Sequence, residues 1–535
     1  MPLTELQQQT IDLVKSQLDL NNPDRVKFIF IDAPTGAGKS LINLFSAKGK
    51  TAYVTTPQRI LVKQYLESIK NVPIYKGLGV GVMGKATYKC IKLSTPEKFE
   101  NCDGAPCIEK VEGENKMCDY YANGCYYYDA VRKAQREPVT ITSLAYCLMA
   151  IKRGIENHAM LTKEEAEMLS DSENELKGWF KRDVLIIDEA HSFDDAIVNF
   201  FTVDLTPFSF DQQLNFEALV EKIDGKDDTE IRNIIMEHVS EIIRLTKDRL
   251  DIEEDESIKK TLRTRIERMS HLVVKLNFDT TYIIQKSDTS INLKPYSPAP
   301  FIKNFLYSFD NVIFSSATFV NLEQLTKSLG IEPNDWVSIS VPSTFDAKRA
   351  PIVFDSVGKI NKESLSEALP KVAKAIDDYA NLYADERILV HCHSYPIQTY
   401  LIENISESNR PRLISHTPED REYQEKVFEY SKKGIFLSVN MTEGLDLKDD
   451  LCRIQIIVKC PYLNLGDKWI KEHYNRDGRA WYETKTLSTI IQACGRIIRS
   501  KDDWGVTVIL DANAFYLIEK YKDREPESFK QRLRR

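Results

Sequence analysis

A strand that runs directly into a glycine loop and then a helix is the strongest constraint on the fold of this chain. The apolar segment KFIFID (27–32) is followed by APTGAGKS (33–40). The two glycines let the backbone curl so that its N–H groups point at a phosphate. The lysine reaches the β- and γ-phosphates, and the serine hydroxyl is placed for Mg²⁺. The residues expected to bind ATP and Mg²⁺ are Gly36, Ala37, Gly38, Lys39 and Ser40.

Short apolar, β-branched runs alternate with helical patterns along the rest of the chain, which is typical of parallel α/β sheets. A chain of 535 residues is also too long for one hydrophobic core. We therefore expect two α/β domains with a junction near 340–352. The predicted strands cover 27–32, 51–56, 138–143, 183–190, 311–318, 387–394, 434–439, 453–459 and 505–510.

The predicted strand at 183–190 ends in two adjacent carboxylates, within the sequence DEAH (188–191). A buried strand rarely ends in two acids unless charge is needed there, so a merely solvated strand end is the minority interpretation. Asp188 is expected to hold Mg²⁺, directly or through water. Glu189 is expected to polarise the attacking water, because phosphoryl transfer needs positioning more than covalent chemistry.

The segment QACGRIIRS (492–500) carries two arginines three residues apart, so on a helix both face the same way. Alone, such a pair is usually a solvated helix face. Together with the preceding Gln-x-x-Gly and a phosphate loop elsewhere, it favours arginine fingers presented across a cleft. With Glu189, the expected catalytic residues are Gln492, Arg496 and Arg499.

Five of the ten cysteines fall within 36 residues, between the phosphate loop and DEAH. The other five are dispersed in apolar surroundings, where they are expected to be small buried hydrophobes. A disulfide framework is not expected in a reducing compartment, so a metal site is the favoured explanation. The spacings lack the C-x₂-C pattern of structural zinc sites, which favours an iron–sulfur cluster. The clustered residues are Cys90, Cys102, Cys107, Cys118 and Cys125.

Taken in order, APTGAGKS, DEAH, SSAT (315–318), TEGLD (442–446) and QACGRIIR resemble the motif set of superfamily 2 helicases. The interposed cysteines make the chain similar to the XPD/DinG branch, the iron–sulfur DNA helicases. Segments such as GKATYKC (84–90) and GCYYYDAVRKA (124–134) open and close the cluster domain in that family. The resemblance covers most of the chain and implies two RecA-like domains, with ATP in the cleft between them.

The resemblance also implies a domain order. It assigns 1–84, 131–194 and 291–342 to the first RecA-like domain and 343–535 to the second. An iron–sulfur domain at 85–130 and a helical arch at 195–290 interrupt the first. An ordinary helical subdomain is the alternative for the arch, in which a hairpin is expected around 251–256. Its helical stripes are Ile231, Ile234, Ile235, Val239, Ile242 and Leu245, then Leu262, Ile266, Met269, Val273 and Leu276.

The family's [4Fe–4S] cluster needs four thiolates, so one of the five cysteines is spare. The family-like flanking segments favour Cys90 and Cys125, and Cys118 lies near Cys125 with no thiol between them. Cys107 is preferred to Cys102 because it follows the turn-forming Gly-Ala-Pro. The expected ligands are therefore Cys90, Cys107, Cys118 and Cys125, with Cys102 as the alternative.

Further roles follow from the resemblance alone. SSAT matches the motif that couples hydrolysis to domain movement, and TEGLD matches the motif that senses nucleotide and strand from the second domain. The residues concerned are Ser316, Ala317, Thr318, Glu443, Gly444 and Asp446.

Gln8 is expected near the adenine, although the neighbouring glutamines leave its register open. TTPQR and HCHSY lie where the family contacts the DNA backbone. Thr56 and Arg59 are therefore candidates for phosphate binding and Tyr395 for the strand path. A structural role is an equal alternative for each of the three.

The implied activity is ATP-driven 5′→3′ translocation on single-stranded DNA with unwinding of forked duplex, carried out by a monomer. Alternatives are a translocase that strips proteins from DNA, an enzyme acting on DNA–RNA hybrids, and a scaffold with a vestigial motor. Intact Lys39, Asp188, Glu189 and Arg499 argue against the scaffold. The net charge of −8 neither indicates nor excludes a nucleic-acid partner. No signal peptide or membrane span is recognised, so a cytoplasmic or nucleoid/nuclear location is expected.

Overall fold

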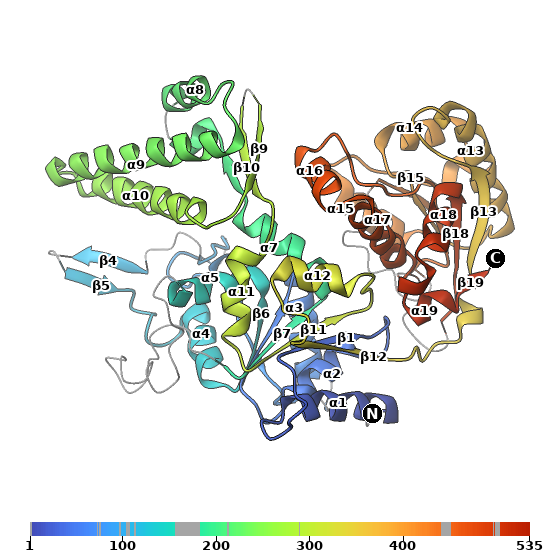
Figure 1. Cartoon of the computed structure of the whole chain (residues 1–535), viewed down its shortest axis with the longest axis horizontal. Coiled ribbons are helices and arrows are strands. Elements are labelled where there is room, and N and C mark those ends of the chain that lie inside the picture. The colour runs from blue at the N-terminus through green and yellow to red at the C-terminus, as the bar shows by residue number, and fades with distance from the viewer. Residues whose placement is uncertain are drawn as a thin grey trace.

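Two seven-stranded sheets, in which every strand pair is parallel, form the framework of the molecule. This computed structural model describes residues 3–534 apart from 72, 74–75, 96–97, 103–106, 112–113, 156–181, 211–212, 288, 440–450, 496 and 498–502. Figure 1 shows the N-terminus in one sheet domain and the C-terminus in the other. The expectation of two α/β domains is confirmed.

The first sheet has the strand order β12-β1-β11-β7-β2-β6-β3. The strand that precedes the phosphate loop and the strand that precedes DEAH, β1 and β7, both border β11. Their carboxyl ends therefore meet at one edge of the sheet, where ligands of parallel α/β sheets bind. The strands are β1 (Phe28–Asp32), β2 (Ala52–Thr56), β3 (Val80–Gly81), β6 (Val139–Ser143), β7 (Val184–Asp188), β11 (Asn311–Ser316) and β12 (Trp336–Ser340).

Helices cover both faces of this sheet because alternate side chains of each strand point to opposite sides. Phe28 and Phe30 of β1 belong to one core layer, whereas Ile29 and Ile31 belong to the other. The Ile29 layer is closed by α1 (Glu5–Leu18), α2 (Lys39–Ser46) and α3 (Arg59–Asn71). The Phe28 layer is closed by α5 (Leu144–Ile155), α7 (Phe193–Phe201), α11 (Ala299–Tyr307) and α12 (Leu322–Leu329).

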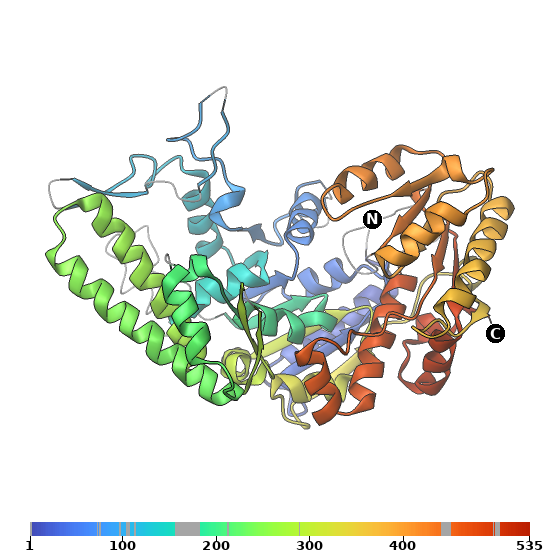
Figure 2. The same ribbon diagram turned by 90° about the horizontal axis from the view of Figure 1, so that it is seen from above.

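Two groups of elements project from the first domain on the same side, as Figures 1 and 2 show. The larger group contains a pair of long helices, α9 and α10, that pack along each other, beside a three-stranded antiparallel sheet of order β8-β10-β9. Its elements are β8 (Val203–Leu205), α8 (Gln213–Lys222), α9 (Asp228–Ile252), α10 (Glu256–Leu276), β9 (Tyr282–Lys286) and β10 (Ile291–Pro295). The smaller group is the cysteine segment, with β4 (Ile108–Val111), β5 (Glu114–Met117) and α4 (Tyr126–Arg136).

The second sheet has the order β15-β16-β14-β17-β18-β13-β19. Its strands are β13 (Ile352–Gly358), β14 (Ile388–His391), β15 (Leu413–Ser415), β16 (Ile435–Ser438), β17 (Ile454–Ile457), β18 (Val506–Asp511) and β19 (Leu533–Arg534). Its helices are α13 (Leu365–Leu382), α14 (Tyr395–Asn404), α15 (Arg421–Tyr430), α16 (Lys468–Arg476), α17 (Arg479–Cys494), α18 (Ala512–Lys520) and α19 (Glu527–Lys530). The five dispersed cysteines are buried, as expected.

An aromatic stack joins the two domains beside the small antiparallel sheet. The ring centroid of Tyr296 lies 4.3 Å from that of His473, which lies 4.5 Å from that of Trp481, and in both pairs the ring planes are stacked nearly parallel. Trp469 Nε1 donates a 2.8 Å hydrogen bond to the carbonyl of Pro295. This contact fixes α16 and α17 against the first domain. No described helix is long and apolar enough to cross a membrane.

Candidate nucleotide cleft and cysteine pocket

The phosphate loop has the backbone conformation that its glycines predict. Gly36 and Gly38 adopt φ values of 81° and 83°, in the left-handed region that other residues rarely occupy. Gly38 caps the N-terminus of α2, so Lys39 and Ser40 open that helix. A Cβ atom at Gly36 would also lie 2.0 Å from the ring of Phe345, which belongs to the connector between the domains. The loop therefore accepts only glycine at position 36.

The DEAH segment faces the phosphate loop across the edge of the sheet. Lys39 Nζ lies 3.2 Å from Glu189 Oε1. Glu189 is one of two described non-glycine residues with positive φ, at 51°. Such a conformation is costly and is found mainly at functional sites. Asp188 is buried at the end of β7, and burial, followed by the charge of Glu189, raises the pKa of its carboxyl to about 6.

His191 connects DEAH to the SSAT motif. Its Nδ1 lies 2.9 Å from Ser316 Oγ, and the Thr318 amide donates a 3.2 Å hydrogen bond to the same hydroxyl. Burial lowers the pKa of His191, so a neutral imidazole is favoured despite Glu189 nearby. Ser316 is thus in contact with DEAH, and Ala317 and Thr318 line the cleft.

Helix α17 brings the second domain to this cleft. Lys485, Ser488, Thr489 and Gln492 line it opposite the phosphate loop. Gln492 Nε2 donates a 3.4 Å hydrogen bond to Ser488 Oγ within the helix. Gln492 therefore lines the cleft. The expected Arg496 and Arg499, and the motif residues Glu443, Gly444 and Asp446, lie outside the described residues.

The glutamine at the phosphate loop is Gln7. Its Nε2 donates a 3.1 Å hydrogen bond to the carbonyl of Ala37, and its side chain also forms the capping box of α1 with Thr4. Gln8, which the sequence favours, instead donates to Asp12 one turn further along the exposed face of α1. Helical geometry explains the difference, because adjacent residues point about 100° apart.

Three residues proposed for DNA binding lie at strand ends or helix starts. Thr56 is buried at the end of β2 and its Oγ1 donates to the carbonyl of Gln58. Arg59 is exposed at the start of α3, and Tyr395 is 38% exposed at the start of α14. The Thr56 hydroxyl is therefore used in a local hydrogen bond, whereas the Arg59 and Tyr395 side chains are accessible to a ligand.

The structure adds two residues to the cleft that the motifs do not mark. Tyr65 of α3 is buried, and its hydroxyl donates a hydrogen bond to Asp188. Arg532, near the C-terminus, donates from Nε to the carbonyl of Ala350, and its Nη2 is buried without a partner among the described residues. Neither residue belongs to the phosphate loop or to DEAH, so only their position in the fold reveals them.

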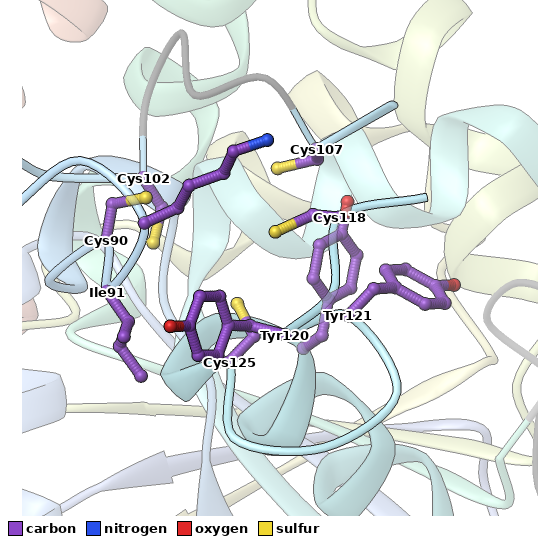
Figure 3. A pocket seen from close by; sticks show the side chains of 10 residues that line it. Cys90, Ile91, Cys102, Cys107, Cys118, Tyr120, Tyr121 and Cys125 are labelled. Carbon is purple, nitrogen blue, oxygen red and sulfur yellow. The ribbon is translucent and has the colours of Figure 1, made fainter. Parts of the chain in front are cut away.

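All five clustered cysteines line one pocket, together with Tyr120, Tyr121 and Tyr128. Figure 3 shows their sulfur atoms turned toward a common space. They form two pairs and one single residue. Cys90 and Cys102 lie on one face of an antiparallel bridge. The Cys90 amide donates a hydrogen bond to the carbonyl of Glu100, and the Cys102 amide donates one to the carbonyl of Tyr88.

Cys107 and Cys118 form the second pair, at the base of the β4–β5 hairpin. The Cys118 amide donates a 2.8 Å hydrogen bond to the carbonyl of Cys107. Cys125 stands alone at the N-cap of α4. Cys102 is 2% exposed. Burial, and then the thiols of Cys125, Cys90 and Cys107, raise the pKa of Cys102 to about 12.

The pocket does not have the compactness of a single-ion site. Among the described side chains, no three His, Cys, Asp or Glu residues are grouped closely enough to hold one metal ion. Four sulfurs around one zinc ion lie within about 4 Å of each other, as Zn–S bonds of ~2.3 Å require. In a cluster each thiolate binds a different iron, so the sulfurs are further apart. The five thiols that line the pocket supply the ligand type that both kinds of site use.

Two family models match the chain. One, described as helicase C-terminal domain, matches residues 379–532. The other, described as type III restriction enzyme, res subunit, matches residues 1–226. The two models correspond to the second sheet domain and to the larger part of the first.

The similar proteins are named as helicases. A probable ATP-dependent helicase of Methanocaldococcus jannaschii is 21% identical over 90% of this chain and 88% of its own length. The ATP-dependent DNA helicase YoaA of Escherichia coli (strain K12) is 26% identical over 46% of this chain, and a regulator of telomere elongation helicase 1 homolog of Aedes aegypti is 25% identical over 38%. The matches span only 40% and 24% of the latter two proteins.

Solved structures share the complete fold. The structure called XPD_Helicase superposes with a TM-score of 0.62 and 16% identity, covering 98% of both chains. The structure of S. tokodaii Xpd4 superposes with a TM-score of 0.58 and 13% identity, and the match covers 99% of this chain and 100% of that one. The chain therefore has the fold of these XPD structures, with two parallel-sheet domains on either side of the cleft.

Proposed function

We propose that this chain is an ATP-dependent helicase that translocates 5′→3′ on single-stranded DNA and unwinds the duplex ahead of it. The 3.2 Å contact between Lys39 and Glu189, in a cleft whose opposite wall is α17, carries the proposal. The similarity to YoaA, which is named an ATP-dependent DNA helicase, supports DNA as the substrate. The direction of movement rests on the family resemblance alone.

In this proposal ATP exchanges one ion pair for another. Without nucleotide, Lys39 neutralises Glu189. When ATP binds, its β- and γ-phosphates compete for Lys39, and Glu189 is released to polarise the attacking water. Ser40 and Asp188 would hold Mg²⁺. Gln492, Arg496 and Arg499 would approach the phosphates as the second domain closes, and hydrolysis would reopen the cleft.

The contact of His191 with Ser316 offers a route from hydrolysis to movement, because SSAT leads out of β11 at the same edge of the sheet. Arg59 and Tyr395 are proposed to contact the DNA strand from the two domains. Thr56 is proposed to shape its path, and Asp446 is proposed to contact the bound nucleotide. Gln7, with Gln8 as the alternative, is proposed to contact the adenine.

We also propose that the cysteine pocket holds a [4Fe–4S] cluster, which would tie the loop-rich segment into a rigid body beside the DNA path. Cys102 is 2% exposed in the pocket and lies beside Cys90 at the antiparallel bridge, which favours Cys102 as a ligand together with Cys90, Cys107 and Cys125. This choice replaces Cys118 of the sequence-based set by Cys102. Cys118 then becomes the spare thiol, held next to Cys107 by the hairpin.

One experiment tests polarity and substrate together. Purified protein is given 5′-tailed, 3′-tailed and forked duplexes, each as DNA and as a DNA–RNA hybrid, and strand separation is followed with ATP. Preferred unwinding of 5′-tailed and forked DNA supports the proposal. Preference for 3′ tails contradicts the polarity. ATP hydrolysis stimulated by single-stranded DNA without any unwinding would favour a translocase that displaces bound proteins.

A further inference from the structure

Lys485 of α17 crosses from the second domain to the DEAH side of the first. Its Nζ lies 2.9 Å from Asp194 Oδ2 and 2.8 Å from Asp195 Oδ2. Both aspartates belong to the first turn of α7. That helix follows directly from the 3₁₀ turn Ala190–Ser192, within the DEAH segment. The ion pair therefore joins the second domain to the stretch of chain that positions Glu189.

The Lys485–Asp194 half of the contact is shielded from solvent. The side chains of Lys485 and Asp194 are 20% and 13% exposed, and Asp195 is 43% exposed. Burial alone would lower the pKa of Lys485, but Asp194 and Asp195 raise it above its ordinary value. Removing the ammonium would leave two neighbouring carboxylates without their counter-charge, which is more costly in a buried site than on a surface. The first turn of α7 is therefore held to α17.

The same helix also carries Gln492. Lys485, Thr489 and Gln492 are spaced i, i+4 and i+7 on α17, so they share one face, and all three line the nucleotide cleft. On the other side of the ion pair, His191 lies 3.5 Å from Glu189 and 2.9 Å from Ser316. A shift of α17 thus acts at once on Gln492 and on the DEAH segment.

We infer that Lys485 is a positioning residue that couples closure of the second domain to the placement of Glu189, through the first turn of α7. The inference rests on the proposed ATP hydrolysis. A purely structural contact between the domains is the alternative. The chain offers a matched control for it, because Lys468 of α16 pairs with Asp228 of α9 at 2.7 Å. Lys468 also joins the two domains, yet it does not line the cleft.

The test compares Lys485→Met, Lys485→Arg, Asp195→Asn and Lys468→Met with the wild type. ATP hydrolysis is measured at saturating single-stranded DNA, and kcat and KM for ATP are determined separately. Lys485→Met is expected to lower kcat at least tenfold and to leave KM within twofold, because the phosphate loop is intact. Lys485→Arg should recover most of the loss. Asp195→Asn should lower kcat less than Lys485→Met, and Lys468→Met should not change it.

Several outcomes would overturn the inference: wild-type kcat in Lys485→Met, an equal loss in Lys468→Met, or a raised KM with unchanged kcat. Circular dichroism checks folding. If Lys485→Met does not fold, Asp195→Asn provides the test, because the wild-type Asp195 carboxylate is partly exposed and its replacement should not unfold the domain. An unchanged kcat in Asp195→Asn would then refute the coupling. A wild type without ATP hydrolysis contradicts the proposed function instead.

A readout that does not depend on turnover separates these cases further. Dyes at the exposed Leu13 of α1 and Tyr516 of α18 report the distance between the domains by energy transfer. A non-hydrolysable ATP analogue is expected to change the transfer in the wild type and in Lys485→Arg. It should not do so in Lys485→Met. An equal response in all three variants would refute the coupling whether or not ATP is hydrolysed.

Discussion

The hydroxyl of Tyr65 donates a 2.9 Å hydrogen bond to Asp188 Oδ2 in the buried floor of the nucleotide cleft. Asn43 Nδ2 in turn donates a 3.1 Å hydrogen bond to the Tyr65 oxygen. One phenol from α3 therefore connects Asp188, which is expected to hold Mg²⁺, to Asn43 of α2. This connection fixes the Asp188 carboxylate before the metal binds.

Tyr65→Phe is expected to weaken Mg²⁺ binding without unfolding the domain. A hydrogen bond to a charged group contributes about 1.5–3 kcal/mol, so the Mg²⁺ concentration for half-maximal ATP hydrolysis should rise by roughly tenfold or more. A Mg²⁺ titration at fixed ATP measures this. Tyr53→Phe, at another buried tyrosine of the same domain, is the control. An unchanged Mg²⁺ requirement in Tyr65→Phe would show that Asp188 is held by other contacts.

The raised pKa of Asp188 predicts how stability depends on pH. Its folded-state pKa of about 6 lies above the ordinary value of 3.8, so the folded, metal-free protein binds the proton more tightly than the unfolded chain. Ionised Asp188 therefore destabilises the fold increasingly as pH rises from about 4 to 6, and fully above 6. Asp188→Asn should raise the melting temperature of metal-free protein at pH 8.

The gain in Asp188→Asn should shrink as the pH is lowered toward 4, where the wild-type carboxyl is protonated in both states. A shift of about two pKa units corresponds to roughly 3 kcal/mol at most. Asp24→Asn, at an exposed site, serves as the control and should leave the melting temperature unchanged. A gain that is equal at pH 4 and pH 8 would indicate a cause other than ionisation.

Lys39→Ala is expected to abolish ATP hydrolysis stimulated by single-stranded DNA, because the phosphates lose their cation and Glu189 loses its partner at 3.2 Å. Binding of the DNA strand itself should persist, since Lys39 lies in the nucleotide cleft. Hydrolysis assays and fluorescence anisotropy with labelled DNA measure the two properties. Continued unwinding by this variant would defeat the proposed motor function.

The cysteine pocket predicts different results for two thiols. Anaerobically purified protein should be brown and contain about four irons per chain if a [4Fe–4S] cluster is present. Cys102→Ser should lose most of the iron, whereas Cys118→Ser should retain it. Iron analysis and visible absorbance provide the measurement independently of activity. Stoichiometric zinc without iron would refute the cluster, and the reverse pattern of iron loss would restore Cys118 as a ligand.

The strands of both sheets were largely predictable from the sequence. All nine predicted segments contain a strand, because residues buried on both faces of a parallel sheet form continuous β-branched runs. The edge strand β12 gave no such signal, since most of its residues are half-exposed. In the α9–α10 pair the helical stripe predicts the buried Ile231, Ile235 and Val239 but also includes Leu245, which is 53% exposed near the tip.

Some features of the candidate site were likewise predictable from the sequence, and others were not. Backbone-determined features follow local sequence, so the Gly36 and Gly38 conformations, the start of α2 at Lys39 and the end of β7 at Asp188 were all predictable. The choice between Gln7 and Gln8 was not, because it depends on the direction in which α1 meets the phosphate loop. The roles of Arg496 and Arg499 stay predictions.

By itself, then, the sequence determined the two α/β domains, the nucleotide loop and the presence of a thiol-rich segment, because each depends on residues adjacent in the chain. Only the tertiary structure brought Tyr65 to Asp188, Lys485 to Asp194 and Asp195, and Cys102 to Cys125. These contacts join residues from separate elements or loops. Their partners are selected by how strands and helices pack in space, and spacing along the chain carries no record of that packing.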